Sequence, residues 1–102
     1  MLETFTINTF SSLIGDEFRL HAAGLPPVPL ELIEATLLDG DSAAPAEHGR
    51  RIPFSIVFRG LREPFLVQRL YVLEHATIGR FELFIVPIGP DARGMRYEAV
   101  FT

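Results

Sequence analysis

The sequence predicts a mainly β protein, an antiparallel six-stranded barrel or sandwich with a short N-terminal helix. Residues 52–101 read as four successive strand-length runs separated by Gly or Pro. Two further runs that suit strands precede them, at residues 18–21 and 29–38. The connections between runs are too short for parallel crossovers, so neighbouring strands should be antiparallel. The length fits one domain that covers residues 1–102.

The composition is that of an ordinary globular protein. Apolar residues make up 48% of the chain and charged residues 22%, which argues against disorder. The aromatic residues are nine Phe and two Tyr, with no Trp, so Phe and Leu should build the core. The chain has no Cys, which excludes disulfides, thiolate metal sites and a cysteine nucleophile.

The sequence predicts a cytoplasmic protein without a membrane partner. Residues 1–5 lack the basic and apolar regions of a signal peptide. No apolar run approaches the roughly 20 residues that a membrane span needs. The absence of Cys also fits a reducing compartment.

The first elements are a short helix and a strand. Asn8 or Thr9 suits the N-cap of a helix that runs through Leu13 and ends at Gly15. The run Phe18-Arg19-Leu20-His21 alternates apolar and polar side chains, as a strand with one buried face does. A Gly-Leu-Pro-Pro sequence then breaks the strand.

The run from Pro29 to Leu38 suits either a strand with a bulge or a short helix. Its Glu, Leu and Ala residues have good helix propensity. We favour a strand, because the β runs around it would otherwise lack a partner. Residues 39–42 carry a turn pattern, and residues 43–51 are expected to form a loop.

The second half predicts a four-stranded meander. Its strands are expected at residues 54–59, 66–75, 80–88 and 95–101. A hairpin turn should form at residues 77–79, and the Pro- and Gly-rich residues 87–94 should form a loop. One face of these strands supplies an apolar core, from Phe54, Ile56, Phe58, Tyr71, Leu73, Phe81, Leu83, Ile85, Tyr97, Ala99 and Phe101.

The opposite face of these strands is also apolar, at Val57, Val72, Phe84, Val86 and Val100. A strand in a half-solvated sheet needs only one apolar face, so something should cover the second. One explanation is the N-terminal segment, with Phe5, Phe10, Leu13, Leu30 and Leu32, folded over it as a second layer. The other explanation is another subunit or partner protein. The sequence leaves both explanations open.

Charge is divided unequally along the chain. Residues 1–49 contain eight acids and one base, whereas residues 50–102 contain eight Arg and five acids. Every basic residue is Arg, the cation favoured at protein interfaces. The two halves either pair within one fold or form surfaces of opposite sign that meet between copies. Nucleic acid is not expected as a partner, because the net charge is −4 and no dense basic cluster occurs.

No pattern in the chain points to catalysis, a cofactor or a metal. His21, His48 and His75 have no metal-ligand spacing, and His75 suits a turn-capping role at a strand end. No serine elbow or phosphate-binding loop occurs. The carboxylates of three successive strands are best explained by cross-strand ion pairs with Arg on the same strands (Glu74, Glu82 and Glu98 with Arg69, Arg80 and Arg96). We therefore expect no enzyme.

Three runs of the second half resemble a small bacterial family of unknown function. They are Gln68 to His75, Glu82 to Pro90 and Tyr97 to Phe101. The opening is similar too, with Leu2-Glu3-Thr4-Phe5, Phe10, Gly15 and Phe18. The likeness covers nearly the whole chain and carries no catalytic residues. It implies a place beside phage-tail or collar-like proteins, and hence a role in assembly.

The sequence therefore predicts a non-catalytic structural or adaptor module that binds protein, either itself or a component of a tail-like particle. The predicted interface residues are Val57, Phe84, Val86 and Val100, with Arg and acid pairs at the rim. The alternative is a barrel that binds a small molecule at Tyr71, Leu73 and Tyr97. Six strands leave little room for it, because even eight-stranded barrels are only just wide enough to hold one small ligand.

Overall fold

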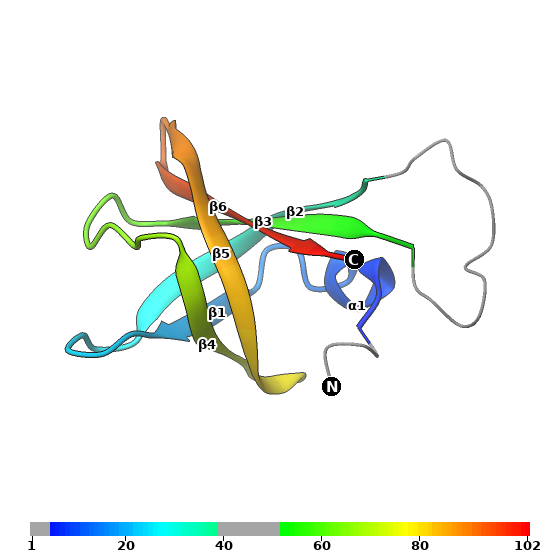
Figure 1. The fold of residues 1–102 in the computed structure, drawn as a ribbon, viewed down its shortest axis with the longest axis horizontal. Coiled ribbons are helices and arrows are strands. Elements are labelled where there is room, and N and C mark those ends of the chain that lie inside the picture. The colour runs from blue at the N-terminus through cyan, green and yellow to red at the C-terminus, as the bar shows by residue number, and fades with distance from the viewer. Residues whose placement is uncertain (1–4, 39–51) are drawn as a thin grey trace.

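A computed structural model describes residues 5–38 and 52–102 of the chain. Its elements are α1 (Ile7–Ser11), β1 (Glu17–His21), β2 (Val28–Leu37), β3 (Phe54–Gly60), β4 (Arg69–His75), β5 (Gly79–Asp91) and β6 (Gly94–Phe101). The strands close into one antiparallel barrel in the order β1-β2-β3-β6-β5-β4 (Figure 1). The predicted fold class is confirmed, and its closure identifies the architecture as a barrel. None of the helices in the described part of the chain is long and apolar enough to cross a membrane.

The strand order corrects the predicted four-stranded meander. Strand β3 pairs with β2 and β6, while β4 pairs with β5 and β1. The barrel therefore consists of two three-stranded meanders, joined by residues 61–68, which cross the end opposite α1 (Figure 1). This crossing is fixed where the Leu66 N–H donates a 3.0 Å hydrogen bond to the Tyr97 hydroxyl. Residues 66–68, predicted as strand, belong to the crossing because Leu66 turns into the core there.

The barrel interior is filled by aromatic and aliphatic side chains, including Phe18, Phe58, Leu73 and Tyr97 at 0% exposure. Helix α1 closes one end, because its Phe10 ring lies 5.2 Å from Phe101 and is fully buried. The helix starts two or three residues earlier than predicted, since Thr6 is its N-cap and the Thr6 N–H donates to Thr9 Oγ1. It also ends at Ser11 and does not run through Leu13. The N-terminal segment thus plugs the lumen and does not cover the outward face of the sheet.

Residues 28–37 form a strand, as favoured from the sequence. Its register shifts between Leu32 and Glu34, so the expected bulge is present at Ile33. The bulge lets Leu32 and Ala35 both face the interior side, opposite Phe58 and Ile56. The predicted turn and loop at residues 39–51 lie outside the described residues.

Strand β5 is longer than predicted, because it continues through the Pro- and Gly-rich run to Asp91. Residues 87–94 are therefore not a loop, and the hairpin turns only at Ala92 and Arg93. The strand passes the two prolines with a register shift between Pro87 and Gly89, where Gly89 takes φ of 109°. A bulge accommodates residues that cannot donate to the ladder, so turn-forming residues occur here inside a strand.

Candidate interaction surface

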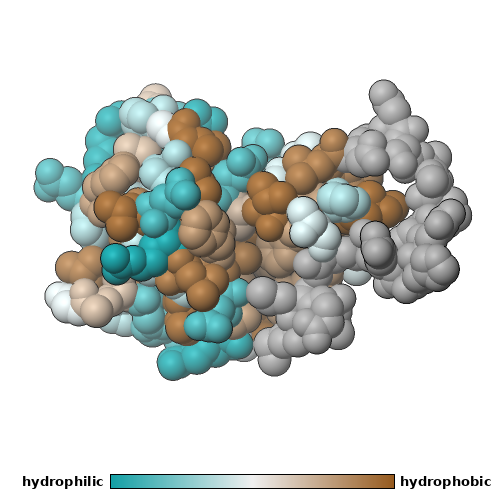
Figure 2. Space-filling model, in the orientation of Figure 1, coloured by the Kyte–Doolittle hydropathy of each residue, from teal (hydrophilic) through white to brown (hydrophobic). Residues whose placement is uncertain are grey.

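The outward face of β4, β5 and β6 carries a row of exposed apolar side chains. Leu70 on β4 pairs directly with Phe84 on β5. Val86 on β5 pairs with Glu98 on β6. In the same register, Phe84 lies opposite Val100, two residues away on each strand. Leu70 is 52% exposed, Phe84 48% and Val100 52%. We refer to Leu70, Phe84 and Val100 as the apolar row. Figure 2 views the side on which β5 lies in front, and brown apolar surface alternates there with teal polar surface.

The four residues predicted for an interface differ in their accessibility. Phe84 and Val100 are exposed and Val86 is half-buried beside them. Val57, by contrast, is only 5% exposed. Its strand lies between β2 and β6, and its direct neighbours across the sheet are Glu34 and Glu98. The aliphatic parts of such long side chains cover a short Val, so Val57 does not belong to the accessible surface.

Leu70 is a member of the apolar row that sequence reasoning missed. The predicted patch included Val72 on the same strand, but Val72 is half-buried between its partners His21 and Glu82. Leu70 lies two residues earlier on the same face, so strand alternation contained the necessary signal. The sequence alone does not reveal the strand register that pairs Leu70 with Phe84.

Charged side chains of both signs surround the apolar row. Of the predicted cross-strand pairs, Arg80 with Glu74 is present at 3.6 Å. The structure gives no ion pair to Glu82, Glu98, Arg69 or Arg96 within the described residues. Arg96 instead donates from Nε to the Gly89 carbonyl at 3.4 Å. The rim of the row thus has acids and bases without a counter-charge among the described residues.

The alternative prediction was a barrel that binds a small molecule, and its candidate ligand residues have buried side chains. Tyr97 and Leu73 are 0% exposed and Tyr71 is 7% exposed. The Tyr71 hydroxyl donates to the Val67 carbonyl at 2.8 Å. Burial raises the pKa of Tyr97, with the Leu66 N–H bond opposing this effect. Both tyrosines therefore anchor the crossing segment, and their hydroxyls are used by the backbone.

Two histidines take part in local contacts. His75 Nδ1 accepts hydrogen bonds from the Thr77 and Ile78 N–H groups, which leaves Nε2–H to donate to Asp16 at 2.8 Å. The expected turn-capping role is confirmed. His21 bonds Glu74 at 3.0 Å, and this bond, followed by Arg80 and Arg19, lowers the pKa of Glu74. His48 lies outside the described residues.

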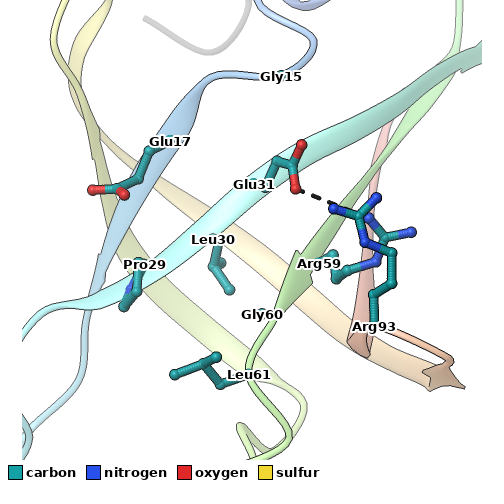
Figure 3. Close-up of a pocket in the computed structure, with 9 residues that line it drawn as sticks. All are labelled: Gly15, Glu17, Pro29, Leu30, Glu31, Arg59, Gly60, Leu61 and Arg93. Atoms are coloured by element: carbon teal, nitrogen blue, oxygen red, sulfur yellow. Dashed lines mark ion pairs between the residues drawn. The ribbon is translucent and has the colours of Figure 1, made fainter.

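A second feature is an open groove of about 380 Å³ on the outward side of β1, β2 and β3 (Figure 3). Glu17 and Glu31 line one wall. Arg59 and Arg93 line the other. The groove combines charges of opposite sign, which no motif in the sequence predicted.

Asp91 holds Arg59 in place beneath the groove. The Arg59 Nε and Nη2 atoms donate to the Asp91 carboxylate at 2.9 and 2.6 Å. The Arg93 and Gly94 N–H groups donate to Asp91 Oδ1 at 2.8 and 3.0 Å. The Arg59 bonds, followed by the Arg93 backbone bond, lower the pKa of Asp91 to about 2. Arg59 is correspondingly raised in pKa by Asp91.

Comparison with protein families yields one match. The model of the family described as "Domain of unknown function (DUF6916)" matches residues 5–101. The chain belongs to this family. No curated protein and no solved structure has significant similarity to this chain. The resemblance to an uncharacterised domain family is thereby confirmed.

The matched region of this DUF6916 chain begins before α1 and ends with β6. All six strands, the apolar row and the groove lie within it. In the described part of the domain, no three His, Asp or Glu side chains gather as a metal ion would require.

Proposed function

We propose that the protein is a non-catalytic docking module that associates with a second copy of itself through the outward face of β4, β5 and β6. The apolar row carries this proposal. Leu70, Phe84 and Val100 lie on three neighbouring strands and each keeps about half of its surface in contact with water. Apolar side chains gathered in this way on a folded domain usually mark an interaction surface.

The charges around the row favour a second copy as the partner. Unpaired acids and a base on one face are self-complementary, since Glu82 or Glu98 of one copy can meet Arg96 of the other. Closely spaced charges of both signs also disfavour a uniformly acidic or basic partner. A stable interface covers about 800 Å² on each side, so three apolar side chains form its centre and the charged rim must contribute the rest.

The biological setting is part of the same proposal. The family resemblance suggested a component of a tail-like particle, where repeated copies of one subunit meet. The cysteine-free sequence agrees with assembly in the cytoplasm. A non-catalytic role rests on the use of the buried tyrosines and His75 in holding turns and crossings.

Sedimentation velocity over a wide concentration range tests the proposal. We expect the wild type to dimerise as concentration rises, and Phe84→Glu or Leu70→Glu to stay monomeric. At a dilution where the wild type is also monomeric, the variants should have the wild-type thermal unfolding midpoint. Leu25→Glu is the matched control, because Leu25 is 42% exposed in the turn between β1 and β2. This control should dimerise like the wild type. A wild type that is monomeric at every concentration would refute self-association.

A further inference from the structure

We propose that the groove on β1, β2 and β3 binds a small aliphatic zwitterion, a molecule with a cationic head and a carboxylate joined by a short apolar stem. The cation would lie between Glu17 and Glu31, and the carboxylate at Arg93 and Arg59. This site is separate from the apolar row, which lies on β4, β5 and β6.

The acidic wall is only partly neutralised by the protein's own cations. Glu17 and Glu31 are direct partners across β1 and β2, an arrangement in which like charges destabilise the pair. The base nearest to Glu31 is Arg59, whose Nη1 lies 3.9 Å away, too far for a hydrogen bond. No ion pair reaches Glu17 from the described residues. An ammonium or guanidinium group between the two carboxylates would remove their repulsion.

The basic wall lacks an anion. The Asp91 carboxylate already accepts from Arg59 and from two backbone N–H groups, so it has no capacity for Arg93. The Arg93 side chain lines the groove and has no ion pair within the described part of the chain. Asp91 also fixes the Arg59 guanidinium in one orientation. A guanidinium group without a partner, with a second and preoriented one lining the same groove, suits a carboxylate.

The accessible apolar side chains between the walls are those of Pro29 and Leu61. A pure anion would face the two glutamates, and a pure cation the two arginines. A ligand with both charges separated by methylene groups satisfies each wall and covers the apolar floor. The volume of about 380 Å³ is within the range of small-molecule sites.

The probe is L-arginine, titrated into ¹⁵N-labelled protein and followed by amide chemical shifts. We expect saturable shifts at Gly15, Gly60 and Arg93, which line the groove. Agmatine lacks the carboxylate and L-norvaline lacks the cationic head. Each should bind about fivefold more weakly, the effect of losing one exposed ion pair. Absence of saturable shifts with L-arginine, or equal binding of agmatine, would overturn the proposal.

Matched variants locate the site. Glu17→Gln and Arg93→Gln should each weaken L-arginine binding about fivefold. Glu82→Gln and Arg69→Gln make the same chemical changes on β5 and β4 and should leave it unaltered. Phe84→Glu should retain binding, so failure of the groove and failure of the docking face are distinguishable. Equal weakening by both pairs of variants would indicate a general charge effect and refute the assigned site.

Discussion

At the scale of single residues, Asp91 connects parts of the chain that are distant in sequence. Its carboxylate holds Arg59 of β3 and the N–H groups that turn β5 into β6. Its carbonyl accepts from Arg62 at 2.8 Å. The neighbouring Gly94 has no space for a side chain, because an added Cβ would lie 2.1 Å from the Gly60 carbonyl oxygen. A charged centre and a close backbone approach thus fix the same hairpin.

The first prediction concerns the pH dependence of Asp91. Its pKa is lowered from 3.8 to about 2 in the folded protein. The ionised form is therefore favoured by folding, so its contribution is complete above the unfolded pKa and is lost as pH falls from about 4 towards about 2. Asp91→Asn should lower the thermal midpoint by several degrees at neutral pH and flatten this acid dependence.

Thermal unfolding at a series of pH values measures this effect. Glu82→Gln is the control, because this carboxylate is exposed and without an ion pair in the described structure, and it should behave like the wild type. An Asp91→Asn variant with the full acid dependence would show that other carboxylates are responsible.

At the scale of elements, α1 has only five residues and owes its stability to packing. Its Phe10 lies among the rings of Phe18, Phe54, Phe81 and Phe101. The helix therefore acts as a lid on the barrel, held by one aromatic side chain. Helix propensity has little influence over so short a segment.

We predict that Phe10→Ala lowers the free energy of unfolding by about 3–5 kcal/mol, the usual cost of removing a buried aromatic ring. Phe84→Ala, which removes the same ring from an exposed position, should change it by no more than about 0.5 kcal/mol. Chemical denaturation of both variants gives the comparison. Similar losses for the two would contradict the buried position of Phe10.

The sequence predicted these elements well where side chains alternate and poorly where backbone geometry decides. Strand β2 was favoured over a helix because its neighbours needed a partner, and β3 and β6 followed from alternation alone. Strand β5 was cut short at Pro87, because the bulge that lets it continue depends on pairing with β6. The N-cap was placed too late because the depth of Phe10 in the core, which sets the start of α1, is a tertiary property.

The candidate surface was partly predictable for the same reason. Alternation identified the outward positions of Phe84, Val86 and Val100. It gave no strand order, so it could not tell that Val57 lies between two glutamates or that Leu70 faces Phe84. The groove was not predictable, since Glu17, Glu31 and Arg59 meet only through register across three strands.

At the scale of the whole molecule, the barrel closes at its shortest seam. Strands β1 and β4 share three paired positions, whereas β3 and β6 share seven. A bond between the side chains of His21 and Glu74 crosses this seam. The molecule should therefore open first between β1 and β4.

Native-state hydrogen exchange tests this prediction. Amides that hydrogen-bond across the seam between β1 and β4 should exchange through a smaller opening free energy than those between β3 and β6. Glu74→Gln should lower protection at the seam more than elsewhere, because it removes the charge that His21 and Arg80 contact. Uniform protection across the barrel would indicate that the seam opens only with global unfolding.

Closure of the barrel has a consequence for how this family can diversify. Each strand has a hydrogen-bonded neighbour on both sides. The barrel therefore leaves little free strand edge for a partner to pair with, and recognition depends mainly on side chains that project from the wall. Positions that point outward can then change while those that point inward preserve the framework. Relatives with the same scaffold can thus acquire new binding preferences through outward-facing substitutions while the core that determines the fold stays the same.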